Sequence, residues 1–386
     1  MKIAIIMPVG EQRGGAEMML LRLLSANLSG PKIVYTLAFL EDGPMVQVVK
    51  EMGYSAKVFD AGHLREAGKY VKTIRLLSRW MKEEKAISVL SWMEKAHFYG
   101  SPAAYLARIP SAYFLHSIPG NHWTNQIAPW FATKAILCCG QSVQKAQALR
   151  YPHRTTRLAY IAVDLEKFDP SALPAPSEAK MKLGFAHDSV IVGITARLQH
   201  WKGVHVFLKA ASLIAKLHPE VTFLVVGGIH EGEPNYLAEL QQQIEDDGIV
   251  ERVHFAGHQT NVPLWMQAMD ILVHCSDNEP TGTVIIEGMA LGKPVIAAKT
   301  VGPMEFVTEG EDGLLVRPGD ADALSLAICR LLENEDLRGK IARAARLRAV
   351  QFGAPRLASD VGQHMCAISL RSSDIPASLV LDDTKL

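Results

Sequence analysis

The stretch Glu279–Ala297, EPTGTVIIEGMALGKPVIA, places a turn, a helix and a buried strand directly one after another. Pro280 and Gly282 mark the turn, and the apolar spacing after them predicts a short helix over residues 283–291. The run KPVIAA that follows is typical of a buried strand. A helix that leads straight into such a strand indicates a parallel βαβ unit, so the stretch predicts an α/β protein.

The same alternation of strand-like and helical patterns runs along the rest of the chain. In the first half the strand-like runs are KIAIIMPVG, KIVYTLAFL, SAKVFDA, AISVLSW, SAYFLHS, AILCCG and RLAYIAV, with helices expected over 15–28 and 63–85. In the second half they are SVIVGITA, VTFLVVGG, RVHFAG, ILVHCS, KPVIAA and GLLVR, with further helices expected over 203–217, 235–247 and 321–333. Both halves therefore predict doubly wound, Rossmann-like domains, and we expect them to face a central cleft that holds the ligand.

The length of 386 residues is too great for one ordinary core, so we expect two domains. We place the N-terminal domain at residues 1–165 and the C-terminal domain at 179–355. A Pro-, Ala- and Ser-rich linker is expected at 166–178. A helix near 356–371 is expected to pack back on the N-terminal domain, and a polar tail is expected at 372–386.

The composition excludes several classes of protein. Hydrophobic residues make up 48% and charged residues 21%, which is typical of a soluble globular protein and not of a disordered or fibrous one. No apolar run approaches the ~18 residues that suggest a membrane span. The apolar beginning lacks a secretory cleavage pattern. Five cysteines form no CxxC pair and no His/Cys cluster with metal spacing, so we expect a reducing cytoplasm and no metal site.

Charge is unevenly distributed although the net charge is zero. Residues 1–165 carry 20 Lys and Arg against 11 Asp and Glu, a net charge of +9, and the remainder carries −9. The basic segment at 69–85 suits either a helix that lies on anionic lipid or the solvated face of a helix packed on its sheet. No aromatic-basic motif accompanies the charge, so nucleic acid is not an expected partner. The basic face would hold Lys72, Arg75, Arg79 and Lys82, and the apolar face Val71, Ile74, Leu77 and Met81.

The helix expected after Gly282 offers a site for a phosphate. Glycine allows the helix to begin tightly at Thr283, and the amides of Thr283, Val284 and Ile285 would then favour an anion. Glu287 lies one turn further on the same face, about 5–6 Å along the axis. That is roughly the step from a nucleotide phosphate to its ribose, whose hydroxyls a carboxylate can bind. The alternative is a surface salt bridge on an amphipathic helix.

Two cations and a glycine pair point toward the same ligand. Arg197 follows an expected strand, and Lys202 precedes an expected helix, where a cation opposes the helix dipole unless an anion lies nearby. Together they could neutralise a diphosphate leaving group, or they are ordinary loop cations. Gly14 and Gly15 precede the first helix, where the backbone can approach a phosphate or sugar closely.

These motifs, taken in their order, resemble those of the retaining glycosyltransferases of family 4 (glycosyl transferases group 1), which have the GT-B fold. They are Gly-Gly-Ala-Glu, a His after a mid-domain strand, R-L-x-x-x-K-G, F-x-G, and E-x7-E followed by G-M-A-x-G-x-P-V-I-A. The resemblance covers nearly all of residues 1–355. One departure is Pro280-Thr281-Gly282 where the family usually has Gly-Phe-Gly, which leaves the donor sugar open.

The resemblance implies a role for each matching position. Glu287 would hold the ribose, Glu279 would lie near the hydroxyls of the donor sugar, and Gly257 with His258 would contact the base. The implied catalytic residues are His116, Glu279, Arg197 and Lys202. The residues implied to bind the nucleotide-sugar donor are Gly14, Gly15, Arg197, Lys202, Gly257, His258, Glu279, Thr281, Gly282, Thr283, Val284 and Glu287. His97 and Trp123 are further candidates for the acceptor side.

The resemblance implies retaining transfer of a sugar from a nucleotide-diphosphate sugar to a hydroxyl acceptor. UDP is the first expected nucleotide and GDP the second, and neither a cofactor nor a metal is expected. The acceptor would be a glycan or a lipid-linked glycan in cell-surface polysaccharide, lipopolysaccharide or glycolipid assembly, at the inner face of the cytoplasmic membrane. A GT-B-shaped sugar-nucleotide 2-epimerase and a non-catalytic binding module are the alternatives. A dehydrogenase would need a Gly-x-Gly-x-x-Gly turn, which this sequence lacks.

Overall fold

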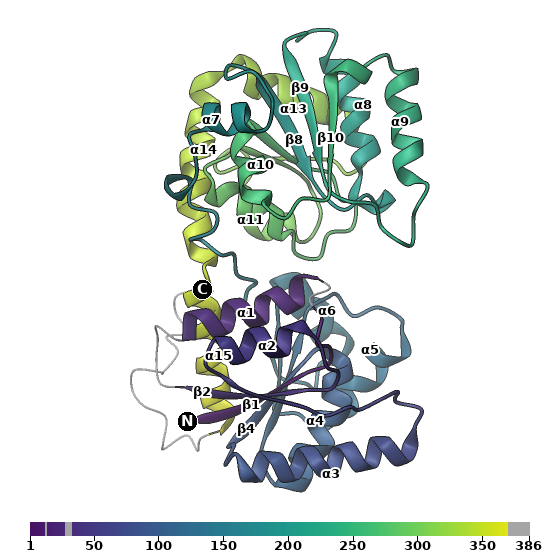
Figure 1. The fold of residues 1–386 in the computed structure, drawn as a ribbon, viewed down its shortest axis with the longest axis vertical. Helices are drawn as coiled ribbons and strands as arrows, with labels where there is room; N and C mark the ends of the chain where they lie inside the picture. The colour runs from purple at the N-terminus through teal and green to yellow at the C-terminus, as the bar shows by residue number, and fades with distance from the viewer. Residues whose placement is uncertain (12–13, 28–32, 370–386) are drawn as a thin grey trace. The chain divides into compact units, whose positions relative to one another are not determined.

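The computed structural model describes residues 1–11, 14–27 and 33–369, which form two compact α/β units (Figure 1). Unit 1 consists of the described residues up to Ala162 together with 354–369, and unit 2 consists of Val163–Gly353. Each unit is built on one parallel sheet. The predicted fold class, two Rossmann-like α/β domains, is therefore confirmed. The polar tail expected at 372–386 lies outside the described residues.

Unit 1 holds a parallel sheet in the order β3-β2-β1-β4-β5-β6-β7. Its strands are β1 (Lys2–Met7), β2 (Val34–Phe39), β3 (Ser55–Val58), β4 (Ser88–Trp92), β5 (Ser111–Leu115), β6 (Ala135–Cys138) and β7 (Thr156–Leu158). Its helices are α1 (Gly15–Asn27), α2 (Pro44–Glu51), α3 (Ala67–Glu83), α4 (Met93–Ala107), α5 (Trp123–Ile127), α6 (Gln141–Arg150) and α15 (Ala354–Ser369), with a 3-10 turn η1 (Ala128–Trp130). The chain passes from one side of β1 to the other when it enters β4, so β1 and β4 flank the topological switch point.

Helix α15 belongs to unit 1, where it packs against α1, β4 and β5. Its apolar side chains recur at helical spacing, and Leu357, Val361 and Met365 are at most 1% exposed. The ring of His364 adds a hydrogen bond between Nε2 and the carbonyl oxygen of Leu158 at 2.7 Å. The last described helix of the chain therefore completes the core of the first unit.

Helix α3 packs one face on α4 and leaves the other exposed. Ile74, Leu77 and Met81 are buried, as the spacing predicted. Val71 was expected on the same apolar face, and this expectation is wrong: its side chain is 43% exposed. It lies instead beside the basic face, whose four members Lys72, Arg75, Arg79 and Lys82 are all exposed.

Unit 2 holds a parallel sheet in the order β10-β9-β8-β11-β12-β13. Its strands are β8 (Val190–Thr195), β9 (Val221–Val226), β10 (Val253–Gly257), β11 (Ile271–His274), β12 (Val295–Ala298) and β13 (Leu314–Val316). Its helices are α7 (Pro176–Lys182), α8 (Val204–Ile214), α9 (Tyr236–Asp246), α10 (Val262–Ala268), α11 (Thr283–Ala290), α12 (Pro303–Phe306), α13 (Ala321–Glu333) and α14 (Glu335–Ala349), with 3-10 turns η2 (Pro170–Ala172), η3 (His200–Lys202), η4 (Val250–Arg252) and η5 (Val350–Phe352). Strands β8 and β11 are neighbours at its switch point, where open α/β sheets bind ligands at the carboxyl ends of the strands.

Residues 166–178, expected as a linker, lie within unit 2 and are partly helical. They contain η2 and the beginning of α7, where Pro176 occupies a first-turn position that does not need an amide donor. Lys180 anchors α7 through an ion pair with Asp270 at 2.9 Å. The proline content that suggested a linker instead marks the start of a short helix.

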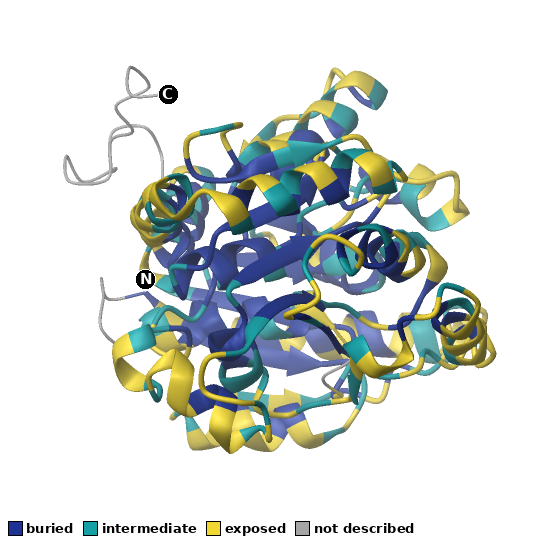
Figure 2. Ribbon diagram, turned by 90° about the horizontal axis from the view of Figure 1, so that it is seen from above, coloured by how far each residue is buried: buried dark blue, intermediate teal, exposed yellow. Residues whose placement is uncertain are grey.

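The interior of each unit is apolar, and the outer helices carry the exposed residues (Figure 2). Strand β1 shows why: Ile3, Ala4, Ile5, Ile6 and Met7 are all inaccessible, because helices cover both faces of a parallel sheet. Among the described helices, none is long and apolar enough to cross a membrane.

Candidate active site

The loop between β11 and α11 holds Glu279 in a buried position, with 7% of the residue exposed. Its Oε2 accepts a hydrogen bond from Nζ of Lys202 at 2.6 Å and lies 3.3 Å from Nε2 of His274. Its Oε1 accepts from the amide of Gly282 at 3.2 Å. Burial alone would raise the pKa of Glu279, but the His274 hydrogen bond and the charge of Lys202 outweigh burial and lower the pKa to about 2. Glu279 is therefore an ionised carboxylate held by three partners.

Gly282 provides the backbone geometry that begins α11. Its φ of 79° lies in the left-handed region, and a Cβ there would lie 2.9 Å from Cδ1 of Ile285. The helix begins at Thr283, as predicted. The expectation that three amides are available there is wrong for one of them, because the amide of Ile285 donates to the carbonyl oxygen of Gly282 at 3.0 Å.

Glu287 lies on the partly exposed side of α11, one turn after Thr283. Val284 shares this side, whereas Ile285 and Ile286 point into the core and are inaccessible. The predicted common face of Thr283 and Glu287 is confirmed. An acidic residue fits into this apolar run because the helix turns it away from the core.

Lys202 ends η3, directly before α8, and its ammonium pairs with Glu279. The side chain is only 17% exposed and crosses the ring of Trp201, with Nζ 3.9 Å from the ring centroid. Gly203 follows with φ 69°, and a Cβ there would overlap the carbonyl oxygen of Cys275. The sequence predicted that a cation at this helix start needs an anion, and within unit 2 that anion is the Glu279 carboxylate.

Arg197 and the two residues implied to contact the base lie along the same edge of the sheet. Arg197 is exposed in the loop after β8. The amide of Gly227, after β9, donates to the carbonyl oxygen of Gly257 at 2.9 Å, and a Cβ on Gly228 would lie 3.0 Å from that of His258. Unit 2 therefore brings these residues to the carboxyl edge that also carries Glu279, since β8, β9, β10 and β11 are parallel.

Two residues that contact Glu279, His274 and Gly302, were not identified from the sequence, and neither was Ser276, which lies beside His274. His274 ends β11, is 4% exposed, and has its Nε2 3.2 Å from Oγ of Ser276. The amide of Gly302, in the loop after β12, donates to the carbonyl oxygen of Glu279 at 3.1 Å, and a Cβ at Gly302 would lie 2.5 Å from that oxygen. The polar ending of the strand-like run ILVHCS was the one signal for His274 and Ser276. No feature of the sequence around Gly302 indicates that it contacts Glu279.

The η3 loop is held on its other side by a histidine and two carboxylates. Nδ1 of His200 lies 2.7 Å from Oε2 of Glu233, and its Nε2 lies 3.0 Å from Oε2 of Glu239. The ring packs on Tyr236 with centroids 4.1 Å apart. The hydrogen bond to Glu233, and then the charge of Glu239, raise the pKa of His200. These contacts fix the segment between Arg197 and the Lys202–Glu279 pair, and sequence reasoning missed them.

His116 follows β5 in unit 1, at the carboxyl edge of that sheet. Its ring packs between Trp92, at a centroid distance of 4.9 Å, and Phe114, at 4.4 Å. Both ring nitrogens are buried without a hydrogen-bond partner among the described residues. Burial lowers the pKa of His116 to about 3, so the imidazole is neutral at pH 7 and keeps one donor and one acceptor for a ligand.

Gly14 and Gly15 lie at the start of α1, on the same edge of unit 1. A Cβ on Gly15 would meet nothing within 4 Å, and one on Gly14 would meet only Oε2 of Glu17 at 3.5 Å. Nε1 of Trp92 donates to the carbonyl oxygen of Ala16 at 2.8 Å and so ties this loop to the residue that contacts His116. Both residues are exposed, and packing among the described residues does not require glycine at either position.

Glu94, in the first turn of α4, was missed by the sequence analysis. With the amide of Asn125 oriented to satisfy its neighbours, Nδ2 donates to Oε1 of Glu94 at 2.8 Å. Burial raises the pKa of Glu94.

The prediction that His97 lines an acceptor surface is wrong, because His97 is inaccessible and its ring stacks on that of Tyr113 with the centroids 4.8 Å apart. Trp123 is 50% exposed.

The two Rossmann-like units and the polar residues at the carboxyl edge of the unit 2 sheet indicate the class of protein. Two Rossmann-like units of this kind make up the GT-B fold, which the solved relatives below share. Residues 177–348 match the family described as "Glycosyl transferases group 1". The matched segment contains the whole edge described for unit 2, from Arg197 to Glu287.

Known proteins that resemble the chain carry the same class of name. The chain is 32% identical over 211 residues to the D-inositol 3-phosphate glycosyltransferase of Corynebacterium urealyticum. The matched region covers 52% of this chain and 49% of that protein. It is 33% identical over 163 residues to the lipopolysaccharide core biosynthesis glycosyltransferase LpsE of Rhizobium meliloti, covering 42% and 45%. The chain thus spans about half the length of these curated relatives.

A solved structure resembles nearly the whole chain. The crystal structure of Anabaena Alr3699/HepE in complex with UDP and glucose matches with a TM-score of 0.80 and 28% identity, covering 95% of this chain and 100% of that one. Its complex with UDP-glucose matches with a TM-score of 0.79 and 27% identity, covering 95% and 99%.

Proposed function

We propose that the protein is a retaining glycosyltransferase that moves a sugar from a UDP-sugar to a hydroxyl acceptor, with GDP-sugars as the second choice of donor. The observation that carries the proposal is the buried Lys202–Glu279 ion pair beside the Arg197 loop and the start of α11. The Anabaena relative, crystallised with UDP-glucose, supports UDP-glucose as the first donor to test.

In this proposal the diphosphate binds where Arg197, Lys202 and the N-terminus of α11 converge on one edge of unit 2. These groups stabilise the negative charge that develops on the leaving phosphate, which is where electrostatic catalysis acts most strongly. Lys202 is held in place by Glu279 before the donor arrives, so little reorganisation is needed. Arg197 and Lys202 supply the positive charge that a metal supplies in other transferases, and the proposed chemistry therefore uses no metal and no cofactor.

The rest of the donor is assigned to the neighbouring residues of the same edge. Glu287 accepts hydrogen bonds from the ribose, and Gly257 with His258 contacts the base. Glu279 faces the donor sugar while it orients Lys202. The distal phosphate and the sugar are assigned to Thr281, Gly282, Thr283 and Val284.

Unit 1 is proposed to serve the acceptor and the transfer step. His116 offers a neutral imidazole with both nitrogens unpaired among the described residues, which suits a hydrogen bond to a sugar hydroxyl. Gly14 and Gly15 allow close approach of a ligand. The acceptor hydroxyl attacks from the side on which the diphosphate leaves and gives its proton to the leaving phosphate oxygen, so the configuration of the sugar is retained.

The acceptor is proposed to be a glycan or lipid-linked glycan in cell-surface polysaccharide, lipopolysaccharide or glycolipid assembly. The names of the relatives, one of which acts in lipopolysaccharide core biosynthesis, support this assignment. We propose that the enzyme is cytoplasmic and binds peripherally at the inner face of the membrane.

Thermal unfolding with nucleotides tests the donor site. We expect UDP to raise the melting temperature by several degrees, because ligand at about 100 times its Kd adds about 2.7 kcal/mol, and EDTA to leave the shift unchanged. GDP and ADP are expected to shift it less. Glu287→Ala should lose most of the shift, whereas Glu245→Ala, which removes an exposed carboxylate on α9, should keep it. Equal indifference to UDP, GDP and ADP would contradict the proposed site.

A basic and apolar surface on unit 1 is the proposed membrane contact. Along α3 and the end of α4 the exposed apolar side chains are Val71 (43%), Leu76 (40%), Tyr105 (76%) and Leu106 (48%). Val71, Arg75, Tyr105 and Leu106 line one shallow hollow of ≈ 450 Å³, which shows that the two helices form one surface. We call the exposed residues of α3 and of the end of α4 the α3–α4 surface.

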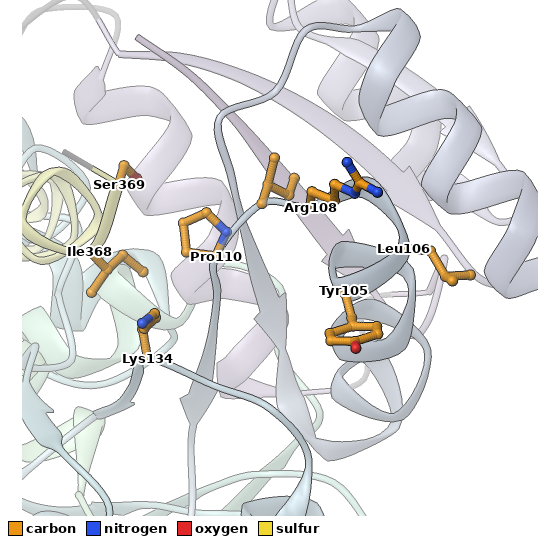
Figure 3. Close-up of a pocket in the computed structure, with 8 residues that line it drawn as sticks. Tyr105, Leu106, Arg108, Pro110, Lys134, Ile368 and Ser369 are labelled. Carbon is orange, nitrogen blue, oxygen red and sulfur yellow. The ribbon is translucent and has the colours of Figure 1, made fainter. Parts of the chain in front are cut away.

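The α3–α4 surface continues toward a second hollow of ≈ 810 Å³, which Figure 3 shows beyond the end of α4. Tyr105 and Leu106 come from the end of α4, Arg108 directly follows that helix, and Ile368 comes from α15. Lys134 adds a further cation to its wall. Aromatic and aliphatic side chains among cations are typical of a surface that rests on anionic lipid headgroups.

Co-sedimentation with vesicles tests the membrane contact. At low salt we expect the protein to pellet with phosphatidylglycerol vesicles and not with phosphatidylcholine vesicles. Arg75→Ala/Arg79→Ala should weaken binding by roughly 30-fold, since each cation near an anionic surface contributes about 1 kcal/mol. Lys209→Ala/Lys216→Ala on unit 2 removes the same charge and should bind as the unchanged protein does. Equal binding of both double variants would argue against the α3–α4 surface.

A further inference from the structure

A group of side chains that could hold a metal ion lies away from the donor edge, in unit 2. His218 lies just before the amino end of β9, whereas the donor edge is formed by the carboxyl ends of the strands. Cys329 and Glu333 lie one turn apart at the end of α13. A ring nitrogen, the Sγ and a carboxylate oxygen from these three residues all lie within 4.8 Å of one another. In a tetrahedral metal site the ligand atoms are roughly 3.3–3.8 Å apart, so small side-chain rotations would suffice.

The backbone on either side of His218 is fixed. The amide of His218 donates to the carbonyl oxygen of Ile214 at 2.8 Å, and its own carbonyl oxygen accepts from the amide of Val221 at 3.2 Å. The guanidinium of Arg252 approaches the same oxygen at 3.5 Å. The imidazole, only 16% exposed, is therefore presented to α13 from a rigid turn.

The ring of His218 lies between two carboxylates. Its Nδ1 lies 3.3 Å from Oε1 of Glu220, and its Nε2 lies 3.4 Å from Oε1 of Glu333. Nε2 is buried and makes no hydrogen bond to any described residue. If Nδ1 donates its proton to Glu220, the lone pair on Nε2 faces the carboxylate of Glu333 and the thiol of Cys329. Lone pairs in such an arrangement repel one another unless a cation lies between them, and metal-binding histidines characteristically donate their other N–H to a carboxylate.

The ligand types select the metal. Cys329 and Glu333 share one face of α13, and Cys329 is partly buried, whereas the Glu333 carboxylate is 65% exposed and free to rotate toward an ion. A set of one sulfur, one nitrogen and one oxygen suits Zn²⁺, while Mg²⁺ and Ca²⁺ prefer oxygen ligands. We propose that His218, Cys329 and Glu333 form a Zn²⁺ site, with a water as fourth ligand and Glu220 orienting the imidazole. The ion would join the turn before β9 to the end of α13.

Cobalt spectroscopy on the full chain tests this site. We expect Co²⁺ to bind with 1:1 stoichiometry, to give the d–d bands of a four-coordinate ion and a thiolate-to-cobalt charge-transfer band, and to be displaced by Zn²⁺. Cys329→Ser should abolish the charge-transfer band. Cys366→Ser, which changes a buried thiol of unit 1, should leave the band unchanged.

Two variants separate the metal site from folding effects. Glu333→Gln changes an exposed carboxylate and should weaken Co²⁺ binding at least tenfold, and Glu220→Gln should weaken it by about 10–100-fold, because it orients the imidazole. A missing charge-transfer band in the unchanged protein would overturn the proposal, as would a band that survives in Cys329→Ser. In that event His218 contacts its two carboxylates and holds no metal. UDP binding plays no part in this readout, so the result is independent of the proposed transferase function.

Discussion

Replacing Lys202 by methionine is expected to lower the rate of UDP release from UDP-glucose by roughly 10²–10³-fold, since removal of one preorganised electrostatic contact to a developing anion costs about that much. Methionine keeps a long apolar side chain over the ring of Trp201 but removes the charge. Loss of the charge also leaves the buried Glu279 carboxylate without its cationic partner. We therefore expect unit 2 to lose up to about 3 kcal/mol of stability.

A double variant distinguishes the catalytic effect from the structural one. In Lys202→Met/Glu279→Gln the buried negative charge is removed together with the cation, so most of the stability should return while the rate stays low. Lys209→Met breaks an ion pair at the surface with Asp247, the residue after α9, and should change neither quantity appreciably. If the double variant regained the rate together with the stability, Lys202 would be a structural residue and the proposed diphosphate site would be in the wrong place.

The strands of both sheets could be predicted from the sequence because a parallel sheet covered on both faces needs nearly continuous apolar runs. The run SVIVGITA forms β8 and the run ILVHCS forms β11.

Helices α4 and α14 were not predicted. Helix α4 contains Gly100 and Pro102, which usually interrupt helices, and α14 buries little more than Ile341, Ala345 and Ala349 along one narrow stripe.

The donor edge could be predicted in part, because some of its features are local. Gly282, Thr283 and Glu287 lie on one helix start, and helical geometry alone relates them. The partnership of Lys202 with Glu279 could not be predicted, because it depends on the pairing of β8 with β11 and on the close approach that Gly203 allows. Residues that are far apart in the sequence meet only once the order of the strands is known.

The contacts of the proposed zinc site also could not be predicted from the sequence alone. Cys329 and Glu333 have helical spacing, but His218 precedes them by more than a hundred residues and no Cys/His spacing motif connects them. Spacing motifs describe sites built from one hairpin or one helix. A site assembled from a turn before β9 and the end of α13 needs the fold first.

Acid is expected to destabilise unit 2 through Glu279. The pKa of this carboxylate is lowered from 4.5 to about 2 in the folded protein, so the ionised form is the one that folding stabilises. Its contribution is complete above pH 4.5 and is lost as the pH falls from there toward 2. The full contribution is about 3 kcal/mol, because a tenfold change in proton affinity corresponds to 1.36 kcal/mol. Urea unfolding at a series of pH values between 7 and 3, followed by a signal from unit 2, would measure the larger part of this loss.

Glu279→Gln shows how much of the acid sensitivity belongs to this residue. Glutamine keeps the shape and can still accept from the amide of Gly282, but it cannot be protonated in this range, so stability should fall less steeply with decreasing pH. Glu245→Gln changes an exposed glutamate on α9 and should reproduce the slope of the unchanged protein. The slope is a stronger test than the stability at pH 7, because any buried substitution lowers stability whereas only an ionised, stabilised carboxylate produces this pH dependence. An unchanged slope in Glu279→Gln would mean that Glu279 does not carry the charge which holds Lys202 in the diphosphate position.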